Sequence, residues 1–141
     1  MLALAVLGAC GGKSFGPEAE LQAWMDAVHE AAEAKDRSEI VDRISASYGD
    51  ARGNSRDDIE NILRLYFLRQ GAVEFIPSRA EITVIGGTAA EISLTVAMAG
   101  TNGGLRGISA DAYRFELELE DDGDDWKLIS ARWGELGGQL R

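Results

Sequence analysis

The sequence predicts an α+β domain, and two observations carry that prediction. Hydrophobic residues recur at helical spacing up to about residue 70 and alternate at every second position from Ala72 onward. Gly86-Gly87 and the acidic Asp-Gly run at 121–125 each separate two alternating segments, which is typical of β-hairpins. Helices come first and antiparallel strands follow, which indicates an α+β class.

Composition limits both the size of the domain and its partners. About 130 of the 141 residues follow the single cysteine, Cys10, and 45% of the chain is hydrophobic, which suits one globular domain. The formal net charge of −10 repels phosphates and anionic lipid head groups, so we expect no nucleic-acid partner. Contact with a membrane would then come through a lipid on Cys10, and no second thiol offers a disulfide.

The first predicted helix covers residues 17–34. Gly16 is at the cap position and Pro17 at the first helical position, where its missing N–H costs nothing. The apolar residues on one face of this helix are Leu21, Trp24, Met25, Val28 and Ala32.

Two further helices follow before the strands. Asp36 and Glu39 have capping-box spacing at the start of a short helix, although the alternation at 44–48 also permits a strand. Ser55 and Asp58 have the same spacing before a third helix, which Gly71 ends. Its stripe of buried positions is Ile59, Ile62, Leu63, Tyr66 and Phe67.

Five strands are predicted, at 73–77, 79–85, 89–99, 110–120 and 126–133, with a glycine-rich loop at 100–107. The fourth strand shows the alternation most clearly. Its inner face carries Tyr113, Phe115, Leu117 and Leu119, and its outer face carries Arg114, Glu116, Glu118 and Glu120. One face packs and the other meets water, as antiparallel sheets allow.

The N-terminus is apolar from Met1 and ends in Leu7-Gly8-Ala9-Cys10. This run resembles the lipobox of a bacterial lipoprotein. The resemblance implies a signal peptide at 1–9, cleavage between Ala9 and Cys10, and acyl chains on Cys10. Residues 10–17 would form a flexible tether, and Gly11 in place of Asp favours the periplasmic face of the outer membrane. The alternative is a buried apolar N-terminus in which Cys10 is an ordinary core residue.

The body of the chain resembles the nuclear transport factor 2-like superfamily (cystatin-like, ketosteroid isomerase-type cone). The resemblance rests on the order of elements, on the last strand from Asp125-Trp126-Lys127 to Trp133, and on Tyr48-Gly49-Asp50-Ala51-Arg52-Gly53, which is similar to a segment of envelope lipoproteins in that superfamily. It spans 18–136 and leaves 137–141 as a C-terminal tail. It implies two to three helices packed on a curved antiparallel sheet of four to six strands, often with a pocket in the mouth of the cone. The superfamily contains both enzymes and binding domains, so fold alone does not give the function.

Candidate site residues are few. His29 is the only histidine and flanks the apolar stripe of the first helix, where a general base is one interpretation and a partly exposed helix residue is the favoured one. Asp50 and Arg52 are expected to pair within their loop, in a structural role. We find no metal-binding or cofactor motif, because the acidic run at 121–125 lacks EF-hand spacing. The pocket-lining candidates are Trp24, Val28, Tyr66, Tyr113, Phe115 and Trp133.

Three functions remain open. The first is a lipid-anchored, non-catalytic envelope domain that binds a partner protein or a small apolar ligand. The second is a small-molecule isomerase or cyclase that uses the cone pocket, with His29 as the candidate base. The third is a structural lipoprotein that forms a homodimer through its sheet.

Overall fold

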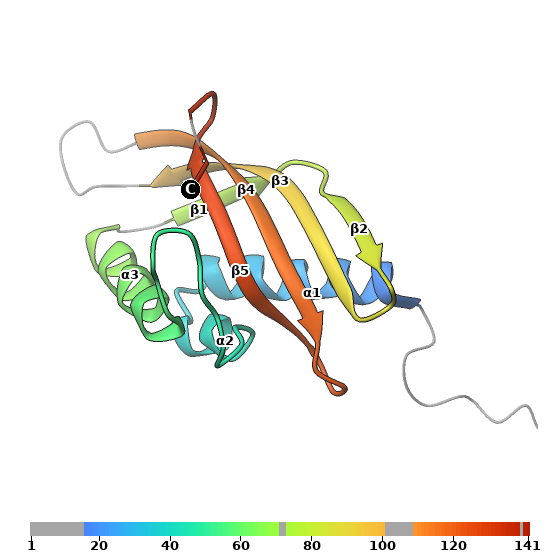
Figure 1. Cartoon of the computed structure of the whole chain (residues 1–141). Helices are drawn as coiled ribbons and strands as arrows, with labels where there is room; N and C mark the ends of the chain where they lie inside the picture. Colours follow the sequence, from blue (N-terminus) through green and yellow to red (C-terminus); the bar gives the residue numbers. More distant parts are fainter. Residues whose placement is uncertain (1–15, 71–72, 101–108, 139) are drawn as a thin grey trace, which may run out of the picture.

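The computed structural model of the chain describes residues 16–70, 73–100, 109–138 and 140–141 (Figure 1). Several sequence predictions therefore lie outside the described residues. These are the cleavage site at Ala9, the lipid on Cys10, most of the tether at 10–17, the stop at Gly71 and nearly all of the loop at 100–107.

All three predicted helices are present: α1 (Gly16–Glu33), α2 (Arg37–Val41) and α3 (Arg56–Arg69). Helix α3 begins with a complete capping box, in which Ser55 and Asp58 each bond the other's backbone N–H. After α1 the chain turns through Lys35, a non-glycine residue with a φ of 55°. The Nζ atom of Lys35 donates to the carbonyl oxygen of Gln70 at 2.5 Å, which joins this turn to the end of α3.

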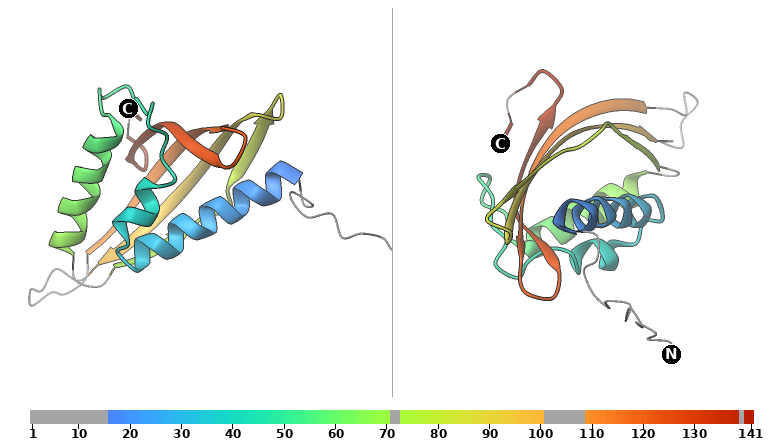
Figure 2. Two further views of the ribbon diagram at one scale, coloured as in Figure 1. Left: turned by 90° about the horizontal axis from the view of Figure 1, so that it is seen from below. Right: turned by 90° about the vertical axis from the view of Figure 1, so that its right-hand side faces the viewer.

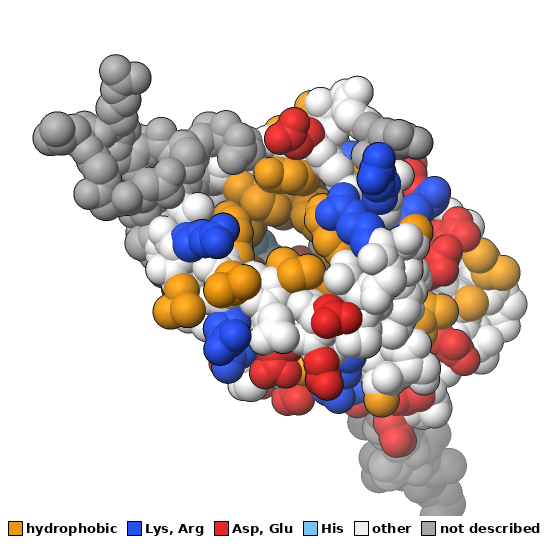
Figure 3. All heavy atoms as spheres, turned by 60° about the vertical axis from the view of Figure 1, so that its left-hand side comes forward, with side chains coloured by type: hydrophobic (Ala, Val, Ile, Leu, Met, Phe, Trp, Pro, Cys, Tyr) orange, Lys and Arg blue, Asp and Glu red, His pale blue; other side chains and the backbone are white. Residues whose placement is uncertain are grey.

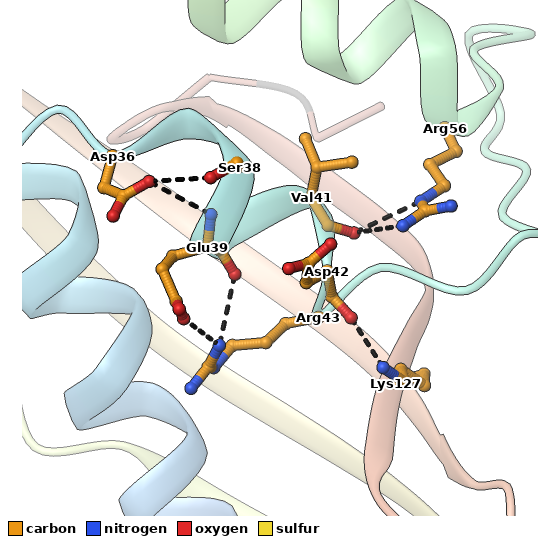
Figure 4. Close-up of polar contacts among 8 residues, drawn as sticks. All are labelled: Asp36, Ser38, Glu39, Val41, Asp42, Arg43, Arg56 and Lys127. Atoms are coloured by element: carbon orange, nitrogen blue, oxygen red, sulfur yellow. Dashed lines mark hydrogen bonds and ion pairs between the residues drawn. The ribbon is translucent and has the colours of Figure 1, made fainter.

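Helix α2 makes only half of the capping box that its sequence suggests (Figure 4). Asp36 accepts a hydrogen bond from the backbone N–H of Glu39 at 3.2 Å, but the Glu39 carboxylate pairs with Arg43 at 2.7 Å. At the other end, the carbonyl of Val41 accepts two bonds from Arg56, at 2.9 and 3.2 Å. Arg43 also donates to the carbonyl of Glu39, at 3.2 Å. The two arginines thus satisfy carbonyls that the end of a helix leaves without a partner, and Arg56 also joins α2 to α3.

The sheet has five antiparallel strands, which confirms the predicted class and strand number. They are β1 (Val73–Pro77), β2 (Glu81–Ile85), β3 (Ala89–Gly100), β4 (Ser109–Asp121) and β5 (Trp126–Glu135). The order is β1-β3-β4-β5, and β2 also pairs with β3 beside β1.

Strand β2 begins two residues later than the sequence predicted, at Glu81 in place of position 79. The reason lies at Ser78, whose backbone N–H donates to Thr95 O at 2.7 Å and whose hydroxyl accepts from Thr95 N at 2.9 Å. The segment between β1 and β2 is held at the middle of β3 by these bonds, outside either ladder.

The sheet curves around the helices (Figure 2). A bulge opposite Glu118 and Leu119 inserts one extra residue into β5, at Ile129, because Glu118 pairs with Ser130 and Leu119 with Leu128. Such an insertion bends the bulged strand. It also lets Leu128 and Ala131 both point inward, with 8% and 6% exposure.

The free edge of β5 is covered by backbone from elsewhere in the chain. Ile44 forms an isolated parallel bridge with Leu128, and Ser45 N donates to Leu128 O at 2.9 Å. The ambiguous segment at 44–48 therefore includes a strand-like bridge. At the other end of β5, Arg141 exchanges two backbone bonds with Trp133, at 3.0 and 3.4 Å. Covering an edge in this way removes a site for aggregation.

The core lies where the N-terminal half of α1 meets the ends of β3, β4 and β5. Leu21, Ile92 and Leu119 have at most 1% exposure. Helix α3, in contrast, has no buried side chain: Ile62, Leu65 and Leu68 are 43%, 47% and 76% exposed. Within the described residues, no helix has the length and hydropathy of a membrane-spanning segment.

Replacing Leu21 by Ala is expected to lower the free energy of unfolding by about 3 kcal/mol, because it leaves a cavity in the packed core. Urea denaturation measures this. The control is Leu68→Ala on the exposed side of α3, which should change stability by less than about 0.5 kcal/mol. Equal effects of the two substitutions would place the core elsewhere.

Candidate ligand cavity

A cavity of about 570 Å³ lies between α1, α3 and the concave face of the sheet. Figure 3 looks into its mouth, where hydrophobic side chains surround a hollow. The mouth is on the α3 side, since Ile62 lines the cavity and is also 43% exposed. The volume lies within the range of cavities that hold drug-sized ligands.

The structure brings all six predicted pocket residues to this one cavity. Helix α1 contributes Trp24 and Val28, and α3 contributes Tyr66. The sheet contributes Tyr113, Phe115 and Trp133. These residues come from the apolar stripes of the two helices and from the inward faces of β4 and β5.

His29 also lines the cavity, on α1, and its side chain is 36% exposed. Its Nε2 atom lies 3.5 Å from Oε2 of Glu33, but the two groups do not form a hydrogen bond. The same Glu33 oxygen accepts from the backbone N–H of Phe75 at 3.3 Å, which joins α1 to β1. Sequence reasoning found no acid for His29, although the four-residue spacing to Glu33 was a sufficient signal.

Two other polar atoms in the cavity wall are buried without a hydrogen bond within the described residues: Nε1 of Trp24 and Oε1 of Gln70. The first can only donate and the second can only accept. Asp26 is the one carboxylate among the described lining residues, and it is exposed and accepts from Gln22 at 3.0 Å. The wall is thus apolar with a few polar groups, as ligand pockets commonly are.

Tyr48 and Asp50 build a rigid loop at the edge of this wall. Tyr48 lines the cavity, and its hydroxyl donates to Asp50 at 2.7 Å. Asp50 also accepts from the backbone N–H of Arg52 at 3.0 Å, and from Asn54 N and Nδ2 at 3.0 and 3.2 Å. Burial, with the Asp50 hydrogen bond, raises the pKa of Tyr48 well above its ordinary value. Burial alone would raise the pKa of Asp50, but the hydrogen bonds from Tyr48, Asn54 and Arg52 outweigh it and lower that pKa.

The sequence suggested that Arg52 and Asp50 pair, but the guanidinium of Arg52 does not contact Asp50. It stacks on Trp133 instead, with Cζ 4.3 Å from the ring centroid, and Nη2 donates to Trp133 O at 2.7 Å. Only the backbone N–H of Arg52 reaches Asp50. The loop is therefore fixed to β5 through a cation–π contact and a hydrogen bond.

The outer face of the sheet is charged. Glu116 forms ion pairs with Arg132 and with Arg114, the latter at 3.8 Å, and Arg114 donates to Ser93 at 2.8 Å. The acidic turn at 121–125 is held by Asp122, which accepts from the backbone of Asp124 and Asp125 at 3.0 and 2.9 Å. Across the described part of the chain, no group of acidic or histidine side chains is arranged to hold a metal ion.

Solved structures of other proteins share this architecture. A nuclear transport factor 2-like superfamily protein from Salmonella enterica superposes with a TM-score of 0.73 at 11% identity, over 84% of this chain and 89% of its own. The domain has the nuclear transport factor 2-like fold. A candidate scytalone dehydratase from Novosphingobium aromaticivorans has a TM-score of 0.76 at 11% identity, over 88% and 85% of the two chains.

Bd1075 of Bdellovibrio bacteriovorus is similar with a TM-score of 0.71 at 11% identity, over 83% of this chain. This chain spans only 41% of Bd1075. No protein-family model and no curated protein matches the sequence. At these identities the likeness concerns the fold, and the cavity must supply the argument for function.

Replacing Asp50 by Asn should lower the free energy of unfolding by about 1 kcal/mol at pH 7, because a charged acceptor becomes a neutral one. The pKa of Asp50 is lowered in the folded protein, so its contribution is present above the unfolded pKa and is lost as pH falls through the folded one. The difference between wild type and Asp50→Asn should therefore shrink below about pH 4. Urea denaturation at a series of pH values measures it, and a constant difference would contradict this role.

Proposed function

We propose that this chain is a lipid-anchored cell-envelope protein whose cone-shaped domain binds a small apolar ligand without transforming it. The observation that carries the proposal is the cavity of about 570 Å³ with a predominantly apolar wall. A soluble domain gains stability by filling such a space with side chains, and keeping it open is costly unless a ligand occupies it.

The lipid anchor rests on the Leu7-Gly8-Ala9-Cys10 run. The N-terminal end of α1 lies at the opposite end of the domain from α3 (Figure 1). Helix α1 has 18 residues and so is about 27 Å long. A chain tethered before Gly16 would hold the mouth away from the membrane, toward the aqueous periplasm. A ligand, or an envelope protein that delivers it, would approach from there.

An isomerase- or cyclase-type enzyme is the second candidate, and the His29–Glu33 pair is the observation that favours it. A carboxylate near an imidazole can orient it as a general base. The distance of 3.5 Å and the missing hydrogen bond leave that orientation incomplete. Conversion of the bound molecule by wild type, lost in His29→Ala with the fold unchanged, would favour the enzyme over the binding protein.

A homodimer formed through the sheet has less support. An apolar outer face would favour it, whereas β4 presents Arg114, Glu116 and Glu118 on that face. Pairs of charged side chains are poor centres for such an interface.

Purification of the chain from its own envelope, followed by native mass spectrometry and organic extraction, tests the binding function. We expect a bound small molecule in wild type and a lower occupancy in Val28→Phe, whose larger side chain takes up part of the cavity. Leu68→Phe, at a position 76% exposed, is the matched control and should retain the ligand. An empty wild-type cavity, or the same ligand occupancy in Val28→Phe as in wild type, would contradict the proposal.

Lipid anchoring has its own test. Cys10→Ser should move the protein from the outer-membrane fraction to the soluble periplasm, because the acylated thiol is removed. Intact-mass analysis of wild type should show a chain that begins at Cys10 and carries lipid. A mature chain beginning at Met1 without lipid mass would end this interpretation.

A further inference from the structure

The loop at 48–54 places a cation beside the apolar cavity. Trp133 lines the cavity, and Arg52 lies over its ring with Cζ 4.3 Å from the centroid. Arg52 is exposed, so its charge stays in contact with solvent. Figure 3 shows Lys and Arg side chains gathered beside the hydrophobic rim of the mouth.

Hydrogen bonds hold both the backbone of the loop around Arg52 and the Arg52 side chain in place. The Asp50 carboxylate accepts four hydrogen bonds from Tyr48, Arg52 and Asn54, and Gly53 N donates to Asp50 O at 3.0 Å. Gly53 has a φ of 80°, a backbone conformation that residues other than glycine rarely adopt. The bond to Trp133 O then holds the guanidinium itself. A group ordered in advance loses little conformational freedom when a ligand binds.

Most of the N–H donors of the Arg52 guanidinium are available to a ligand. It carries five N–H groups, and its one hydrogen bond within the described residues uses a single nitrogen. Its charge has no carboxylate partner there, whereas Arg37, Arg43 and Arg132 each pair with a glutamate. Arg79, which lines the cavity, likewise has no carboxylate partner within the described residues, but Arg52 is held against the aromatic wall by its cation–π contact with Trp133.

We propose that Arg52 binds the carboxylate of an amphipathic ligand whose apolar body occupies the cavity. The planar fork of arginine matches a carboxylate in two parallel hydrogen bonds. The strong negative charge of the chain would repel such an anion from most other surfaces. The proposal rests on the proposed function, because it names the chemical class of the ligand for the same cavity.

Two fluorescent probes that differ only in the head group test it: 1-pyrenebutyrate and 1-pyrenebutanol. The protein is the full chain with Cys10→Ser, which removes the lipid and the need for detergent. At low salt we expect the carboxylate to bind about fivefold more tightly than the alcohol, as suits a partly exposed ion pair. The preference should fall when salt rises to about 500 mM, because screening weakens the pair.

Arg52→Gln should remove the preference and leave alcohol binding unchanged within about twofold, since Arg52 does not itself line the cavity and the hydrogen bonds of Asp50 still hold the loop. Arg52→Lys should keep part of it, because lysine retains the charge without the fork. Arg132→Gln on the outer face is the control and should keep all of it. Equal binding of both probes to wild type, or a preference that survives Arg52→Gln, would overturn this inference alone. Failure of both probes to bind would instead overturn the proposed function.

Discussion

The concave face of the sheet is larger than the helices can cover. The packed core at one end of the sheet and the open cavity at the other both result from this constraint. Strand β3, 12 residues long, pairs with β1, β2 and β4, and the bulge at Ile129 bends β5 inward. At one end Leu21 of α1 is fully buried against the sheet, with 0% exposure. At the other end α3 has no fully buried side chain, and its apolar stripe lines the cavity.

The periodicity of the sequence predicted the elements that depend on local chemistry. The Ser55–Asp58 box, the alternation of β4 and the stripe of α1 are all set by residues close in sequence. Where the prediction was incomplete, a contact from a distant segment decided the outcome. Ser78 is bound by Thr95 and delays β2, and Leu128 draws Ile44 into a bridge. Such contacts leave no periodic signal in either segment.

In the candidate site too, features set by residues close in sequence could be predicted, whereas contacts between distant segments could not. Its apolar wall was predicted because inward faces of helices and strands converge in this fold. The pairing of His29 with Glu33 had a signal in the four-residue spacing, which sequence reasoning missed. The stacking of Arg52 on Trp133 joins residues 81 positions apart and had no such signal. The short loop that carries Arg52 could be recognised, whereas the side chain that it meets could not.

A crystal structure of the protein purified from the cells that naturally produce it tests the central claim most directly. We expect continuous electron density for a small molecule in the cavity between α1, α3 and the concave face of the sheet, in contact with the aromatic wall. Side chains that close the cavity completely, or ordered water that fills it, would contradict the claim that this domain holds an apolar ligand.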